Sequence, residues 1–463
     1  MASEMTRRDF LKASLAVLGS AALPGGFIFA APRGWKPTRK PNLVFGVMSD
    51  SHLRTDWTGL KPSRSFTHKY IIAAFEYFKS VGVDAVVHLG DMAHRGQSLE
   101  MQFHADAWKK VFGDSGPIKL FVTGNHDAEG GGYGDFAAKV FPDETERAKH
   151  LLATDMATNW ERIWGEPYLE VWHKEVKGYH FFGRNWTGDE MDTVRLVKEN
   201  AVKWRLNGNK PFFLLMHLRP NWRKQRLCDE LAEFRNAVGF FGHAHVSNSS
   251  WGTLEFKNFP LIQCGALTPG GENHVIGIPE LKLPIEGVDV AMCGASRHGM
   301  IVRVYDKMLT IERRELGEGG SLGADWVMPF GRFEPHPFSA GELKNVIGKP
   351  QFGKIAKLKV ESVKLKGGED AVRVLIPLAD GNPDSRVYAY HVVVVGEARM
   401  TKLEKVVCSA GCNAGIGREP NGGVTTLDIP KSELPPGKKL AISVRPLSSL
   451  GTSGKAIIAR LMV

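Results

Sequence analysis

The sequence has few cysteines and lacks the signatures of several common protein classes. Its 463 residues include five cysteines, an odd number that is too sparse for a disulfide framework: Cys228, Cys264, Cys293, Cys408 and Cys412. Cys408 and Cys412 are close in sequence, but spacing alone leaves open whether they pair or stay free thiols. The absence of a Gly-x-Ser-x-Gly elbow and of a dinucleotide fingerprint argues against a serine hydrolase or a Rossmann enzyme. The common zinc-finger, basic-zipper and aromatic signatures are also missing, so we expect no sequence-specific nucleic acid binding.

A long uninterrupted hydrophobic run is lacking as well. The apolar segment from Leu15 to Ala31 is broken at Pro24-Gly25-Gly26, whereas a membrane span needs about 20 apolar residues. It follows Thr6-Arg7-Arg8-Asp9-Phe10-Leu11-Lys12, which resembles a twin-arginine signal. We therefore predict that residues 1–31 are a signal peptide, that the twin-arginine machinery exports the folded protein, and that the mature chain has no membrane span. The implied location is the periplasm or the exterior of a bacterium. An uncleaved anchor is the alternative, because Ile28 and Phe29 stand where a small residue usually precedes cleavage.

Length and charge narrow the remaining classes. A chain of 463 residues favours two folded domains. The formal net charge is +10, and the signal contributes three positive and two negative charges, which leaves +9 on the mature chain. A basic surface favours binding of anionic substrates or of anionic surfaces.

The pattern of apolar runs predicts an α/β domain followed by an all-β domain. Short buried strands are expected over 43–48, 85–89, 118–122, 212–216 and 238–241, and helices over 69–80, 99–112, 190–205 and 224–234. Hairpins are expected for 168–172 with 179–182 and for 301–305 with 308–313. Short alternating strands from residue 353 onward predict a β-sandwich of the immunoglobulin or fibronectin kind. The predicted divisions are the signal 1–31, a basic Pro-rich linker 32–41, a catalytic domain 42–330, a linker 331–352 and the sandwich 353–463.

Polar residues follow each of the five predicted strands of the first domain. The five blocks are Asp50-Ser51-His52, Gly90-Asp91, Gly124-Asn125-His126-Asp127, His217 and Gly242-His243-Ala244-His245. Any one of these motifs is weak evidence, because a lone histidine after a strand usually has a structural role. Ligands in α/β sheets bind beyond the carboxyl ends of the strands, so five blocks in order predict one site. Carboxylates and imidazoles clustered in this way need cations to balance them.

The ordered blocks resemble the calcineurin-like metallophosphoesterases, whose pattern is Asp-x-His, Gly-Asp, Gly-Asn-His-Asp/Glu, His and Gly-His-x-His. The resemblance covers about residues 42–330 and implies a β-sandwich flanked by helices with two transition-metal ions, which can be Mn, Fe, Zn or Ni. It also implies that a metal-bridged hydroxide hydrolyses an anionic phosphate ester. The implied ligands of the first ion are Asp50, His52, Asp91 and His245. Those of the second are Asp91, Asn125, His217 and His243, with Asp91 as the bridge.

The same resemblance implies that His126 assists the leaving group. Asp127 is expected to orient His126, the alternative being a structural cap for the following loop. His94 stands where purple acid phosphatases have a tyrosine ligand, which argues against a purple ferric enzyme. We expect His94 to face solvent, with substrate contact as the alternative.

Substrate contacts beyond the metals are harder to predict from the sequence. Arg54, Arg95 and Arg219 lie near ligands, and one of them is expected to bind phosphate. Tyr133 in a glycine-rich loop, and Trp222, can either stack on a substrate or lie in plain surface loops. The predicted enzyme is a metal-dependent phosphoric ester hydrolase, either a phosphatase or a phosphodiesterase. Narrower phosphodiesterase or nucleotidase specificity, and an idle surface-binding module, are the alternatives.

Overall fold

A computed structural model of the chain describes twelve segments. They are residues 29–30, 37–55, 67–129, 138–208, 210–220, 226–268, 285–286, 297–306, 308–329, 348–379, 386–397 and 402–462. Most of the predicted signal, the loop with Tyr133, Trp222, Cys293 and most of the predicted linker 331–352 lie outside these residues. Within them, no helix is long and apolar enough to cross a membrane.

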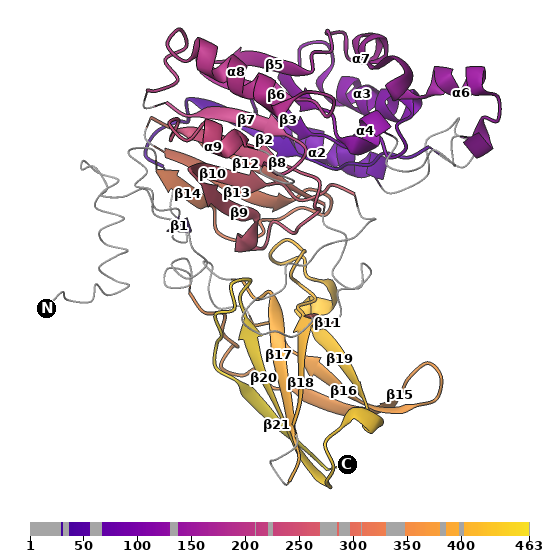
Figure 1. The fold of residues 1–463 in the computed structure, drawn as a ribbon. Coiled ribbons are helices and arrows are strands. Elements are labelled where there is room, and N and C mark those ends of the chain that lie inside the picture. Colours follow the sequence, from indigo (N-terminus) through magenta and orange to yellow (C-terminus); the bar gives the residue numbers. More distant parts are fainter. Residues whose placement is uncertain are drawn as a thin grey trace, which may run out of the picture.

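The first sheet has seven strands in the order β1-β14-β13-β12-β2-β3-β4 (Figure 1). Their bounds are β1 Phe29–Ala30, β2 Leu43–Met48, β3 Ala85–Leu89, β4 Ile118–Val122, β12 His298–Val304, β13 Met308–Glu315 and β14 Trp326–Pro329. Strands β2, β3 and β4 are parallel, whereas β12, β13 and β14 add antiparallel pairs. Phe29 and Ala30, which we assigned to the signal, pair with β14 at the edge of this sheet.

The second sheet has six strands in the order β5-β6-β7-β8-β10-β9. Their bounds are β5 Val171–Val176, β6 Tyr179–Arg184, β7 Phe212–Met216, β8 Ala237–Phe241, β9 Leu254–Lys257 and β10 Phe259–Gln263. Strands β6, β7, β8 and β10 run parallel, and β5 and β9 close the edges as antiparallel partners.

The two sheets pack face to face between layers of helices. Phe45 of β2 meets Phe181, Phe213 and Phe240 of the other sheet edge-on, with ring centroids 5.0–5.9 Å apart. Alternate residues of the same strands point outward to the helices, which explains why these strands are apolar on both faces. Helices α2 Thr67–Val81, α3 Ser98–Phe112 and α7 Met156–Trp164 pack in the core outside the first sheet. Helices α8 Glu190–Asn200 and α9 Leu227–Glu230 pack outside the second. The mixed α/β fold is confirmed.

Two predicted helices are longer than those observed. Helix α8 ends at Asn200 rather than Arg205, because the chain continues in turns and Arg205 has a positive φ of 53°. Helix α9 spans only Leu227–Glu230, whereas we predicted a helix over 224–234. Short helices α4 Asn125–Glu129 and α6 Glu144–His150 were not predicted.

The C-terminal region forms two further sheets. One has the order β11-β18-β17-β20-β21 and the other β15-β16-β19. Their bounds are β11 Ile285–Glu286, β15 Lys359–Lys364, β16 Asp370–Ile376, β17 Ala389–Val395, β18 Lys402–Cys408, β19 Thr425–Pro430, β20 Lys439–Leu447 and β21 Ile457–Met462. Valine, leucine and isoleucine side chains from both sheets share one core. Strand β11 comes from the predicted catalytic region, yet it pairs with β18.

The C-terminal region also contacts the first and second sheets directly. The ring of His298, at the start of β12, donates through Nε2 to the Asn413 carbonyl over 2.9 Å. Leu450 packs in the core between the first and second sheets. The backbone N–H of Trp251 donates to Ser449 Oγ over 3.0 Å. Cys408 and Cys412 are buried thiols in this region, with their Sγ atoms 3.0 Å apart.

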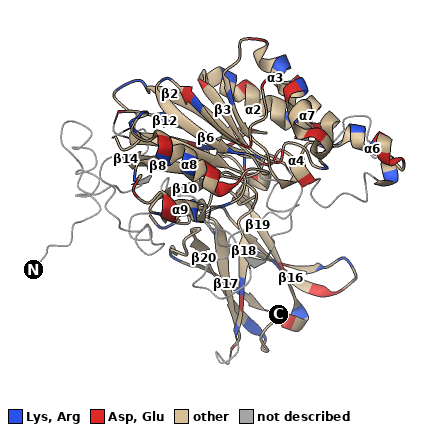
Figure 2. Ribbon diagram, turned by 45° about the horizontal axis from the view of Figure 1, so that its top comes forward, with Lys and Arg blue, Asp and Glu red and all other residues tan. Residues whose placement is uncertain are grey.

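Charged side chains lie mainly on the outer helices and turns. Basic and acidic segments alternate along α3, α6 and α8 (Figure 2). These three helices therefore carry charges of both signs.

Candidate metal centre

The side chains that we predicted as ligands come together at the carboxyl ends of five strands. Asp50 and His52 follow β2, Asp91 follows β3, and Asn125 follows β4. His217 follows β7, and His243 and His245 follow β8, so both sheets contribute. Buried positions predominate: Asp50, His52, Asp91 and His217 are each at most 3% exposed.

Asp50, His52 and His245 form one group that can hold a metal ion. His245 Nε2 lies 3.2 Å from Asp50 Oδ1 and 3.1 Å from His52 Nε2. The backbone N–H of His243 donates to both oxygens of Asp50, over 3.2 and 3.0 Å, which fixes the carboxylate.

Asp91, His217 and His243 form a second such group, and Asn125 joins it. His217 Nε2 lies 3.1 Å from Asp91 Oδ2, from His243 Nδ1 and from Asn125 Oδ1. His243 Nδ1 is also 3.2 Å from Asn125 Oδ1. Four potential ligand atoms therefore surround one point.

Asp91 links the two groups through a single oxygen. Its Oδ2 lies 3.1 Å from His217 Nε2 and 3.6 Å from His52 Nε2. Its Oδ1 accepts the backbone N–H of His126 over 2.9 Å. One oxygen is thus held by the protein while the other faces both groups.

The hydrogen bonds around these side chains fit cations. His217 Nδ1 donates to the Leu89 carbonyl over 2.7 Å, so in the neutral ring the lone pair of Nε2 faces Asn125 Oδ1, which can only accept. Lone pairs that face one another in a buried site repel unless a proton or a metal ion lies between them. Mutual distances near 3 Å suit nitrogen and oxygen ligands around an ion with bonds of about 2.0–2.2 Å. The donor set therefore fits a transition-metal ion.

Charge coupling within the metal-free site is strong. Burial would lower the pKa of His217, but the Asp91 carboxylate raises it to about 9. Burial would raise the pKa of Asp91, but His217 lowers it to about 2. Burial lowers the pKa of His52 to about 3, against the opposing charge of Asp91. Asp91 and His217, 3.1 Å apart, therefore stabilise each other's charged forms.

The backbone is strained where the ligands lie. Among the described residues, nine other than glycine have positive φ, and five of them are expected ligands: Asp50 at 51°, His52 at 43°, Asp91 at 55°, His243 at 71° and His245 at 50°. Such angles are unusual for residues with a side chain and concentrate at functional sites. Neighbouring glycines allow the close approach: a Cβ on Gly124 would lie 2.2 Å from Asp91 Oδ1, and one on Gly242 would lie 2.1 Å from Ser49 Oγ.

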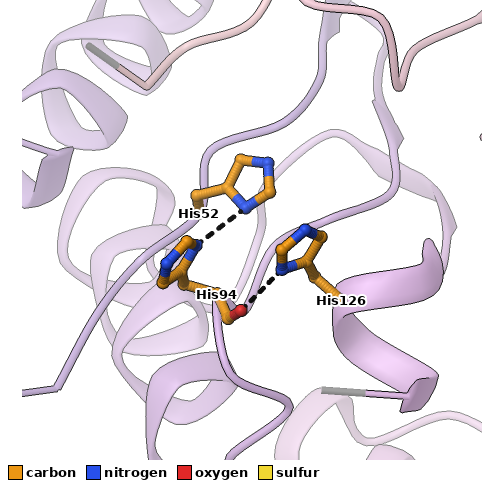
Figure 3. Close-up of side chains that lie close together, drawn as sticks. All are labelled: His52, His94 and His126. Atoms are coloured by element: carbon orange, nitrogen blue, oxygen red, sulfur yellow. Dashed lines mark hydrogen bonds between the residues drawn. The ribbon is translucent and has the colours of Figure 1, made fainter. Parts of the chain in front are cut away.

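His126 lies beside the first group together with His94 (Figure 3). Its ring centroid is 4.5 Å from that of His52. His126 Nδ1 donates to the backbone carbonyl of His94 over 2.6 Å, since a carbonyl can only accept. The ring is therefore oriented by the main chain.

The prediction that His94 faces solvent is wrong. The residue is 6% exposed, and its Nδ1 lies 3.2 Å from His52 Nδ1. Because His52 turns Nε2 towards the first group, its Nδ1 carries the hydrogen and donates to His94. Burial, with the nearby His52 and Arg54, holds the pKa of His94 far below its usual range, which agrees with a neutral acceptor.

Asp127 has backbone partners instead of the His126 ring that we expected. Its Oδ1 accepts from Ala93 N–H over 2.7 Å and its Oδ2 from Gly124 N–H over 2.9 Å. Burial, reinforced by the charge of Asp91, raises its pKa to about 7. Asp127 ties the loop after β3 to the loop after β4, which fits the structural alternative.

The three predicted arginines occupy different surroundings. Arg54 is close enough to His94 for its charge to lower that pKa. Arg95 donates from its guanidinium to the Thr55 carbonyl over 3.2 Å. Arg219 pairs with Glu255 and lines a pocket beside His243.

Sequence reasoning missed Trp186. Its ring lies 6.0 Å from that of His217 and is stacked 6.5 Å from that of His243. Its Nε1–H donates to Glu129 over 2.5 Å. Its position in the sequence could have indicated it, because Asn185-Trp186 follows β6 just as the ligand blocks follow their strands.

Residues 43–247 match the model of the calcineurin-like phosphoesterase family, and these residues contain all five blocks. This part of the chain is thus similar to calcineurin-like phosphoesterase domains. No curated protein matches the sequence.

Several solved structures align with this chain at low identity and with TM-scores below 0.5. A dimetal phosphatase from Danio rerio is 10% identical over 63% of this chain and 100% of its own, with a TM-score of 0.34. Purple acid phosphatase PPD1 from yellow lupin (Lupinus luteus) is 11% identical over 63% of this chain and 55% of its own, with a TM-score of 0.38. A putative 5'-nucleotidase from Staphylococcus aureus is 9% identical over 90% of this chain and 89% of its own, with a TM-score of 0.31.

Proposed function

We propose that the protein hydrolyses a phosphate ester at a dinuclear metal centre. Asp50, His52, Asp91 and His245 would hold one ion, and Asp91, Asn125, His217 and His243 the other. The observation that carries this proposal is that Asp91 Oδ2 faces both donor groups. Bound ions of Mn, Fe, Zn or Ni would supply positive charge for the phosphoryl oxygens and acidify water.

His126 is the proposed general acid. Its Nδ1 is committed to the His94 carbonyl, so the proton given to the leaving oxygen is carried on Nε2. A fixed ring orientation favours proton transfer, because the donor must lie within hydrogen-bond reach of the oxygen. Asp127 has a positioning role: it holds the loops that carry Asp91 and Asn125.

Arg54 is the proposed phosphate contact among the three arginines. Its charge acts on His94, whose ring stacks on that of His126, whereas Arg219 is paired with Glu255 and Arg95 donates to Thr55. A guanidinium beside the general acid would bind the phosphoryl oxygens that the ions leave exposed.

A substrate panel on metal-analysed protein tests the function. Phosphomonoesters, phosphodiesters and nucleotides would be compared, with Asp91→Asn as the inactive control. We expect hydrolysis of at least one class by the wild-type protein, and that class decides between phosphatase and phosphodiesterase or nucleotidase specificity. Folded, metal-replete protein that is inert on the whole panel would favour the surface-binding module instead.

We further propose export by the twin-arginine machinery and an immunoglobulin- or fibronectin-like fold for residues 353–463. The Arg7-Arg8 pair supports the first, and the two packed C-terminal sheets support the second. Changing both arginines to lysine should leave the protein in the cytoplasm, as fractionation would show. Unchanged export of this variant would point to another route.

A further inference from the structure

A pocket lies beside the second donor group. Its volume is about 350 Å³, and its lining includes His243, Arg219, Glu255 and Gln263 together with Phe241 and Val246. These residues stand at or beyond the carboxyl ends of β7, β8 and β10, or on the edge strand β9. The pocket therefore includes one proposed ligand, His243, and is otherwise built from residues outside the ligand set.

Gln263 is the distinctive residue of this pocket. It is 5% exposed, and its side-chain Nε2 is buried with no hydrogen-bond partner among the described residues. Its backbone is held firmly, because it pairs with Phe241 in the sheet and its carbonyl accepts from Asn248 Nδ2 over 2.8 Å. Buried amide groups are rarely left unsatisfied in folded proteins, so an unpaired one in a pocket wall points to a ligand.

The charges in the lining are already balanced. Arg219 and Glu255 form an ion pair with a separation of 2.5 Å between Nη2 and Oε2. Glu255 balances the charge of Arg219, and the walls formed by Phe241 and Val246 are apolar. The lining therefore suits an uncharged organic group with an oxygen that accepts from the Gln263 amide.

We propose that this pocket binds the uncharged, oxygen-bearing organic part of the phosphate ester, and that the Gln263 amide donates a hydrogen bond to that oxygen. This inference rests on the proposed hydrolase function and narrows its substrate class to esters of hydroxylated or carbonyl-bearing alcohols. Phosphate esters whose organic part is a plain hydrocarbon group would occupy the same pocket but would accept no hydrogen bond from the Gln263 amide.

Two matched esters test the proposal. Glucose 6-phosphate and cyclohexylmethyl phosphate both carry a six-membered ring on a primary phosphate ester, but only the first has a ring oxygen and hydroxyl groups. We expect the wild-type protein to favour the sugar ester. Gln263→Leu should raise KM for the sugar ester about 2- to 12-fold, the contribution of one neutral hydrogen bond, and leave kcat and the cyclohexylmethyl ester nearly unchanged.

Control measurements separate this claim from the proposed function. Gln102→Leu makes the same change on the outer helix α3 and should alter neither ester. Should Gln263→Leu fail to fold, inhibition of the wild-type protein gives the answer, because glucose should compete better than cyclohexylmethanol. Equal KM values for both esters, unchanged by Gln263→Leu, would overturn the pocket assignment while leaving the hydrolase intact. Wild-type protein inert on all esters would remove the proposed function itself.

Discussion

The side chain of His94 is predicted to set how tightly the first metal ion is held. It is the hydrogen-bond acceptor for His52 Nδ1, at 3.2 Å, and it is almost completely buried. His94→Phe keeps a ring that can stack on His126, whose plane lies 16° from that of His94, but removes the acceptor. The buried N–H of His52 then has no partner at that position.

The expected cost follows from that lost bond. A buried donor left unsatisfied costs about 1–3 kcal/mol, which corresponds to about 5- to 150-fold in affinity. Replacing the partner of a ligating histidine typically weakens metal binding by about 10–100-fold, in the same range. Only the first ion should be affected, because His217 is oriented separately by the Leu89 carbonyl.

The assay is competition for metal with a chelator, with both ions counted by elemental analysis. His94→Asn is the matched control, because its amide oxygen can replace Nδ1 as the acceptor while the ring is lost. We expect His94→Phe to release one ion at a chelator concentration at which His94→Asn retains two. The backbone carbonyl that orients His126 survives both changes, so turnover at saturating metal should stay near wild type. Wild-type metal affinity in folded His94→Phe would refute the reasoning.

Three further predictions concern the acid, the proton balance and the domain contact. His126→Ala should keep its fold and metal content yet lose about 10²–10⁴ in turnover on esters with poor leaving groups, and less on esters with good ones; wild-type rates on a poor leaving group would exclude the role. Metal binding near pH 7.5 should release a proton, because the pKa of His217 is raised to about 9 in the metal-free protein and its Nε2 must be deprotonated to ligate. Affinity should accordingly rise with pH up to that value, and calorimetric heats that do not depend on the ionisation enthalpy of the buffer would contradict this. Removing residues 345–463 should spare the metal ligands. It also removes Leu450 and so exposes the apolar surface that Leu450 covers. In the full chain, Leu450→Ala should lower the free energy of unfolding by about 2–5 kcal/mol with metal content unchanged, which denaturant unfolding and metal analysis would check.

Local sequence determined the strands of the catalytic sheets and the order of the ligand blocks. Four of the five ligand-bearing strands begin and end where the apolar runs do, because residues buried on both faces leave a continuous apolar signal. The ligand blocks stand out because each combines a strand end with Asp, Asn or His. Helix ends such as that of α8 were less predictable, because turns after Asn200 use the same residue types as helices.

Only the tertiary structure decided which partners these side chains have. His94 looked like a surface residue in sequence, yet packing between the loops after β2 and β3 buries it against His52. Asp127 is adjacent to His126 in sequence, but its oxygens bind the backbone of Gly124 and of the distant Ala93. Gln263 carries no motif, and its importance arises because β10 lies next to β8 and brings its amide to a pocket beside His243. Sequence periodicity reports which face of an element is buried, whereas hydrogen-bond partners depend on which elements become neighbours in space.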